Sequence, residues 1–167
     1  MILEIVGTAL LVYTVGGLLG YAVHWMFHQS WSGPLYRLHR MHHDRLYPAG
    51  DFLSDVYRGA GVNNTAPWFT AILVAVLAPA FLALWKLGVP GGLILFAAAE
   101  STAIGMANNW VHDSLHIRGH FLERFRAFRV WRTAHRVHHA NVATNLGIFT
   151  FGWDKIFGTF RKPHVNE

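Results

Sequence analysis

Residues 2–28 have the sequence ILEIVGTALLVYTVGGLLGYAVHWMFH, in which Glu4 is the only acidic or basic residue before the histidines. About 20 apolar residues in a helix cross the hydrocarbon core of a bilayer, so residues 2–23 are predicted to form a membrane span. No basic residue precedes this stretch, so we expect it to be retained as a helix and not cleaved as a signal peptide. The span runs directly into His24 and His28, which lie one helical turn apart.

The composition agrees with a membrane protein. Of the 167 residues, 53% are hydrophobic and only 14% are charged, whereas soluble domains have about 25% charged residues. A chain of this length is expected to form one domain, so residues 1–167 are predicted to be a single membrane-embedded domain. The absence of cysteine excludes disulfides, thiolate nucleophiles and Cys-ligated iron–sulfur clusters within the chain.

Two further stretches, 67–85 and 89–111, are also apolar enough to span a bilayer, and Glu100 is their only charged residue. The short link between them contains Gly and Pro, which predicts a helical hairpin. Residues 112–139 are expected to be mostly helical, with a break near Gly119. The predicted fold is therefore all-α, an integral-membrane helical bundle of about three spans with a cytoplasmic helical cap.

Basic residues indicate the orientation, because cytoplasmic loops of membrane proteins carry an excess of Lys and Arg. Thirteen of the 14 fall on one predicted side, and only Lys86 falls on the other. The thirteen are Arg37, Arg40, Arg45, Arg58, Arg118, Arg124, Arg126, Arg129, Arg132, Arg136, Lys155, Arg161 and Lys162. The chain is therefore predicted to lie in a bacterial inner membrane, with its amino terminus outside and its histidines on the cytoplasmic side.

Ten of the 12 histidines fall into four boxes of alternating spacing. They are HxxxH (His24, His28), HxxHH (His39, His42, His43), HxxxH (His112, His116) and HxxHH (His135, His138, His139). Residues three and four apart share a face of a helix, so each box is predicted to give one metal ion two or three nitrogen ligands. A single box is usually coincidental, but four boxes on one predicted membrane face indicate a metal centre.

The number of imidazoles predicts more than one metal ion. Imidazole suits zinc, copper, iron and nickel, so the ligand type leaves the metal open. A zinc site uses three or four protein ligands, whereas ten imidazoles are enough for two metals. His120 continues the spacing of His112 and His116 and is a candidate eleventh ligand, and His164 is expected to lie in the tail. Candidates for orienting the imidazoles are Asp44, Asn109, Asp113 and Asn145, with capping or solvation as the alternative.

The four boxes together resemble a known family. HWMFH (24–28), HRMHH (39–43), HDSLH (112–116) and HRVHH (135–139) look like the boxes of the fatty acid hydroxylase and sterol desaturase superfamily. The segment FGWDKIFGTF (151–160) is similar to that family's closing signature, in which Trp-Asp precedes Phe-Gly-Thr. The resemblance implies a non-haem centre of two iron ions, O₂ as co-substrate and a lipid substrate. Zinc can replace the iron during purification but has no redox chemistry.

The reaction that the resemblance implies is hydroxylation or desaturation of an unactivated C–H position, on a fatty acyl or sterol-like chain. The chain is shorter than the larger family members, with three expected spans where those usually have four. Small bacterial carotenoid hydroxylases of the wider group have a similar length, but their HxxxxH boxes have one spacer residue more. Carotenoid ring hydroxylation is therefore kept as an alternative.

Electrons for such a reaction must come from another protein, because the chain has neither cysteine nor a G-x-G-x-x-G nucleotide-binding motif. A ferredoxin or cytochrome is the expected donor, and nucleic acid is not an expected partner. The basic residues Arg124, Arg126, Arg129, Arg132 and Arg136 either dock this donor or anchor the chain to anionic lipid headgroups.

Two other classes of function remain open. One is a non-catalytic metal-binding or zinc-transporting membrane protein. Transporters place ionisable residues near the midplane, whereas here only Glu100 lies there, and it is a functional candidate for that reason. The other class is an interfacial scaffold, which would need the arginines but not the ordered histidines.

The three predicted spans make a prediction about the termini. Because an odd number of spans separates them, tags placed at the amino and carboxyl ends should report opposite sides of the membrane. The measurement is accessibility of each tag to an impermeant reagent in intact and in opened cells. Two tags on the same side would mean that the number of spans is even.

Overall fold

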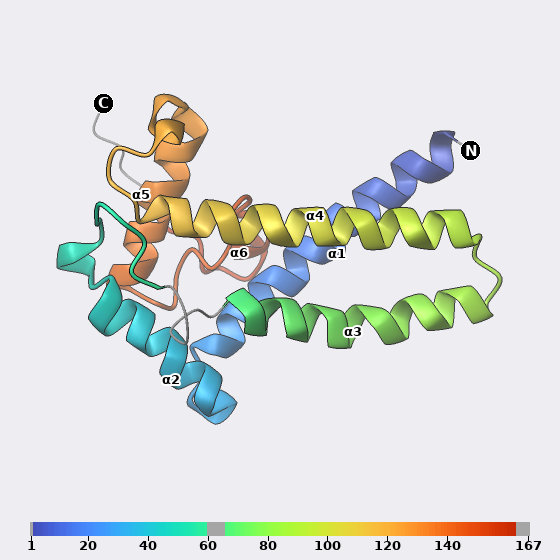
Figure 1. The fold of residues 1–167 in the computed structure, drawn as a ribbon, viewed down its shortest axis with the longest axis horizontal. Helices are drawn as coiled ribbons and strands as arrows, with labels where there is room; N and C mark the ends of the chain where they lie inside the picture. The colour runs from blue at the N-terminus through green and yellow to red at the C-terminus, as the bar shows by residue number, and fades with distance from the viewer. Residues whose placement is uncertain (1, 60–65, 163–167) are drawn as a thin grey trace.

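The computed structural model describes residues 2–59 and 66–162, and this part of the chain is all-helical (Figure 1). It contains no β-strand within those ranges, only an isolated bridge between Ser54 and Ile117. The predicted all-α fold is thus confirmed. His164 lies outside the described residues.

Three long helices form the elongated part of the molecule. They are α1 (Ile2–Phe27), α3 (Ala66–Lys86) and α4 (Gly91–Leu115). Helices α3 and α4 run antiparallel as the expected hairpin, and α1 crosses them (Figure 1). Gly88, in the link of the hairpin, has a φ of 85°, a conformation that glycine adopts without steric cost.

The outer faces of these helices are apolar and uncovered. Leu3 is 87% exposed, Trp85 64% and Leu95 72%. So much exposed apolar surface would be unfavourable in water and indicates contact with lipid. By length and hydropathy, two of the described helices, Ile2–Phe27 and Pro67–Lys86, could cross a membrane. Helix α4 is as long, but its second half carries Asn, His and Asp side chains, so the third span remains a prediction.

Three short helices lie in the half of the molecule away from the amino terminus and the α3–α4 link, with α6 beside α1 (Figure 1). They are α2 (Pro34–Met41), α5 (Arg126–Ala140) and α6 (Gly152–Ile156). A buried hydrophobic cluster joins α4 to α5 there and is formed by Val111, Leu115, Phe128 and Ile148. Helix α4 ends at Leu115 and Gly119 has a φ of 67°, so the break expected near Gly119 is present.

Arg132 fastens α5 to the end of α4. Its guanidinium donates to the carbonyl oxygens of Ser114 at 3.2 Å and Ile117 at 2.8 Å. It also pairs with Glu123 and lies over the ring of Phe128. Arg132 therefore connects α5 to the end of α4, a role that the sequence does not predict beside docking of a donor and anchoring to lipid.

Candidate metal centre

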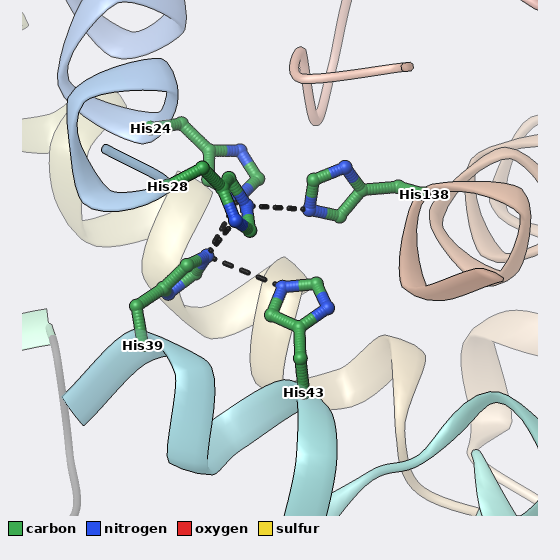
Figure 2. Close-up of side chains that lie close together, drawn as sticks. All are labelled: His24, His28, His39, His43 and His138. Atoms are coloured by element: carbon green, nitrogen blue, oxygen red, sulfur yellow. Dashed lines mark hydrogen bonds between the residues drawn. The ribbon is translucent and has the colours of Figure 1, made fainter. Parts of the chain in front are cut away.

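All ten box histidines meet at the junction of α1, α2, α4 and α5, in two neighbouring groups. We name the first group cluster A; in it, one ring nitrogen of each histidine lies within 4.8 Å of the others (Figure 2). Cluster A consists of His24, His28, His39, His43 and His138. We name the second group cluster B. Cluster B consists of His42, His112, His116 and His135, together with His139, whose Nε2 lies 3.2 Å from Nε2 of His135. His139 also forms a group with His42 and His43, so it lies where the two clusters meet.

The residues of cluster A come from three helices. His24 lies in the last turn of α1 and His28 directly follows that helix, His39 comes from α2, and His138 comes from α5 (Figure 2). His43 follows α2 in a π-helical turn over His42–Leu46. Single π-turns of this kind are rare and occur frequently at functional sites.

The two HxxHH boxes differ from the sequence prediction, because the three histidines of each box do not all lie in the same cluster. In the first box, His39 and His43 join cluster A while His42 joins cluster B. In the second box, His135 and His139 lie in cluster B and His138 lies in cluster A. In the second box, which lies wholly in α5, residues i+3 and i+4 fall on opposite sides of residue i at about 100° per residue. In the first box, the chain passes from α2 into the π-helical turn between His39 and His42. Each box therefore connects the two clusters.

Protons alone cannot satisfy the nitrogens of cluster A. Nε2 of His39 lies 3.1 Å from that of His24, 3.0 Å from that of His28 and 3.2 Å from that of His43. A neutral imidazole has a single N–H and a single ring lone pair, so one nitrogen cannot hydrogen-bond to three others. A shared cation would accept all of these lone pairs at once, and the residues present therefore fit a metal ion.

The outer nitrogens of four of the rings are held by backbone carbonyls. Nδ1 of His24 lies 2.7 Å from the carbonyl oxygen of Leu146. Nδ1 of His138 lies 2.7 Å from the carbonyl oxygen of Thr144. In cluster B, Nδ1 of His139 lies 2.6 Å from the oxygen of Tyr47. A carbonyl only accepts, so Nδ1 must carry the proton and Nε2 is left with its lone pair facing the cluster.

Burial keeps the imidazoles of α5 neutral. Loss of solvation, reinforced by the neighbouring rings, lowers the pKa of His135 and that of His138 well below the ordinary value. Burial likewise lowers the pKa of His139 to about 3. Only the neutral form has a lone pair to give to a metal ion. These rings are therefore in the ligating form at neutral pH.

One of the four residues expected to orient the imidazoles contacts a box histidine. Oδ1 of Asp113 lies 3.3 Å from Nδ1 of His112. Asp44 instead pairs with Arg40 on the surface. Asn145 is fully buried, but it ties α5 to the segment that follows α6, through Ala134 and Arg161.

The other partners of the rings were missed from the sequence because they are backbone oxygens. The residues that provide them, Tyr47, Phe52, Thr144 and Leu146, have no side-chain type in common. No sequence signal could have identified them. Asp154 was also missed as a site residue, although the quoted closing signature contains it.

His120 lies apart from both clusters of the described chain. The break at Gly119 ends the helical spacing before it, and its ring packs against Trp110, Phe121 and Phe128. Its Nδ1 accepts from the backbone N–H of Leu122, which caps a 3-10 turn. Glu100 lies within α4, and its Oε2 is buried without a hydrogen-bond partner.

An apolar cavity of about 450 Å³ lies between α1, α3 and α4, within the usual size range of ligand sites. Its walls are largely aliphatic and aromatic. At one end it is lined by His24 and His39 of cluster A and His112 of cluster B. Asn109, one of the residues expected to orient the imidazoles, also lines the cavity. The cavity therefore connects the apolar helices to both clusters.

Comparison with known proteins identifies the family of this arrangement. Residues 9–159 match a family model described as fatty acid hydroxylase. No curated protein sequence matches the chain, and neither does any solved structure.

The split of the boxes makes a prediction about metal content. After loading with Fe(II), the unchanged chain should hold about two ions. His135→Ala removes a ligand from cluster B and His138→Ala removes one from cluster A, so each variant should hold about one ion. The variant with both changes should hold almost none. His28→Ala combined with His138→Ala affects cluster A alone and should still leave about one ion per chain.

Metal content is measured by elemental analysis of the purified, folded chain. His120→Ala is the matched control and should keep the full content, since His120 lies apart from both clusters. Loss of both ions from each single variant would show that the clusters do not bind independently.

Proposed function

Because the chain belongs to the fatty acid hydroxylase family, within the fatty acid hydroxylase and sterol desaturase superfamily, we propose that it is a membrane-bound, O₂-dependent lipid oxidoreductase. Its substrate is a fatty acyl or sterol-like chain, which it hydroxylates or desaturates at an unactivated C–H position. Hydroxylation would place one oxygen atom of O₂ on the carbon and reduce the other to water with two external electrons. Desaturation would remove two hydrogens from neighbouring carbons, and these hydrogens, with two external electrons and two protons, would reduce O₂ to two molecules of water.

The observation that carries this proposal is the end of the apolar cavity. His24 and His39 of cluster A line it together with His112 of cluster B. A hydrocarbon chain in the cavity would exchange lipid contact for protein contact without crossing water, so entry costs little solvation energy. One of its carbon atoms would then lie beside both clusters.

Iron is the metal that fits this chemistry. Two iron ions held by clusters A and B would supply the O₂-dependent oxidation of a C–H bond, which no acid–base side chain can perform. The ten box histidines are the proposed ligands, and the carbonyls of Leu146, Thr144 and Tyr47 would fix the direction of their lone pairs. Zinc would fit the same nitrogens but would not support the reaction.

The cavity residues would orient the substrate. Leu73, Phe81 and Ile104 are among its apolar walls, and they would hold the chain extended and exclude water from the reacting carbon. Asn108 and Asn109 lie in the same lining. Their amides would hydrogen-bond to a polar group of the substrate and so set which carbon reaches the metals.

We place α1, α3 and α4 in the bilayer with the cap on the cytoplasmic side of a bacterial inner membrane. Each of the three long helices has an exposed tryptophan near the end that faces the histidine clusters. These are Trp25 in α1, Trp68 in α3 and Trp110 in α4, with side chains that are 46%, 51% and 50% exposed. Tryptophan side chains gather at membrane–water interfaces. This row of tryptophans supports α4 as a third span beside α1 and α3.

The donor of electrons would dock on α5. Arg126 and Arg136 are exposed, and neither is held by another described residue. Arg136 follows His135 of cluster B directly in the sequence. Arg129 donates to the carbonyl oxygens of Glu123 and Arg124, and Arg132 is occupied by α4. Arg126 and Arg136 are therefore the residues through which an acidic ferredoxin or cytochrome would be attracted.

The proposed substrate leads to a test of the cavity. Ala97 lines it and is 7% exposed, so Ala97→Phe should fill part of it and lower turnover about 10-fold or more, as steric misplacement does. Metal content should not change. Ala99→Phe on the exposed side of α4 is the matched control and should be nearly silent.

Turnover is followed by mass spectrometry of lipid extracts from cells that contain or lack the active chain. The expected product is heavier by one oxygen or lighter by two hydrogens. An iron-loaded chain that leaves every membrane lipid unchanged while an electron donor is present would refute the proposal, as would full activity with zinc alone.

The proposed docking of the electron donor on α5 makes a separate prediction. Arg126→Glu combined with Arg136→Glu should lower turnover with the protein donor about 10-fold or more, because electrostatic steering changes association rates by that order. Turnover driven by a small chemical reductant should be spared. Arg37→Glu on α2 is the control for the change in charge. Equal loss by both electron routes would show that these arginines support structure or substrate access instead.

A further inference from the structure

We infer that Asp154 is a positioning residue for cluster A, acting through the loop at residues 144–147 that holds the outer nitrogens of His24 and His138. Asp154 would not touch the metal or the substrate. This inference rests on the two-metal centre of the proposed function, but not on the reaction or the lipid.

The carboxylate of Asp154 is completely buried at the start of α6. Its Oδ1 accepts the backbone N–H of Leu146 at 2.7 Å, and its Oδ2 accepts that of Gly147 at 2.9 Å. The hydroxyl of Thr159 donates to Oδ1 at 2.8 Å. A buried carboxylate is costly unless such donors surround it, so its contacts hold these backbone atoms in one place.

The same loop faces cluster A with its carbonyls. Leu146, whose N–H binds Asp154, accepts Nδ1–H of His24 with its own oxygen at 2.7 Å. Thr144, two residues earlier, accepts Nδ1–H of His138 at 2.7 Å. Asn145 between them donates its N–H to the oxygen of Thr159. Asp154 and Thr159 thus hold the loop from one side while two ligand rings bind to it on the other.

The loop has little room to adopt another shape. A Cβ added at Gly147 would lie 2.1 Å from the oxygen of Thr150 and 2.9 Å from Oδ2 of Asp154. Glycine alone allows the backbone to approach the carboxylate this closely. A displacement of the carboxylate would therefore reach Leu146 and its carbonyl directly.

Cluster B is held by a different loop. Nδ1 of His139 binds the oxygen of Tyr47, and Nδ1 of His116 binds that of Phe52 at 3.2 Å. The loop carrying these oxygens is held by Arg58, which pairs with Asp51 and binds the oxygen of Leu46. Asp154 makes none of these contacts, so its effect should be confined to cluster A.

The test compares Asp154→Asn with the unchanged chain by equilibrium dialysis against Fe(II) alone, without oxygen. The amide keeps the size of the carboxylate, but its NH₂ group cannot accept the N–H of Gly147 or Leu146. Loss of such an orienting partner costs about 10- to 100-fold in metal affinity. We expect a loss of that size in one of the two binding steps and no change in the other.

Two backgrounds identify the cluster affected. In chains carrying His135→Ala, where cluster A is the intact site, Asp154→Asn should weaken Fe(II) binding by the same factor of about 10–100. In chains carrying His138→Ala, where cluster B is the intact site, it should have no effect. Asp44→Asn, an exposed carboxylate next to His43 in the sequence, is the matched control and should be silent in both.

Equal weakening in both backgrounds, or none in the first, would overturn the inference. If Asp154→Asn fails to fold, Thr159→Val removes one hydrogen bond to the carboxylate and should weaken cluster A alone by a smaller factor. Because the Thr159 hydroxyl also contacts Tyr21, Tyr21→Phe is its control and should be silent. No selective change with Thr159→Val would also overturn the inference. An unchanged chain that binds no Fe(II) would instead refute the two-metal centre of the proposed function.

Discussion

The rest of the structure depends on the crowding of ten imidazoles in a site from which water is largely excluded. Their Nε2 atoms approach one another to about 3 Å, as in the three neighbours of His39, although a neutral ring has one proton to share. Protonation is opposed by burial, which lowers the pKa of His135 and that of His138. Bound metal ions would resolve this conflict, and folding of the segments that carry these histidines is therefore expected to be linked to metal binding.

The arrangement around the clusters follows from the need to aim these lone pairs. Each cluster has its own loop: residues 144–147 serve His24 and His138, and residues 47–52 serve His116 and His139. Each HxxHH box contributes to both clusters. The two centres are therefore oriented separately but connected rigidly through the same helices, which would keep a fixed spacing between two metals that act together.

The position of the clusters at the end of the long helices relates the site to the membrane. Apolar side chains of α1, α3 and α4 face outward and also line the cavity between them. The polar cap closes this cavity where the helices end, so that His24, His39 and His112 stand at the boundary between an apolar and a polar region. An enzyme that oxidises lipid with electrons from a water-soluble protein needs such a boundary, because its two reactants arrive from different phases.

The sequence by itself determined the helical fold, the four boxes and the family, because these depend on local spacing and on apolar runs. The pattern at 2–28 specifies an apolar helix with His24 and His28 on one face whatever surrounds it. Tertiary structure alone decided which ring belongs to which cluster, since His42 and His43 are neighbours in the chain and yet join different clusters. It also decided that His120 lies apart from the clusters, that Arg132 binds the end of α4, and that Asp154 binds Leu146, whose oxygen faces Nδ1 of His24. Those outcomes depend on backbone carbonyls and on contacts between distant segments, and neither leaves a pattern in the order of the side chains.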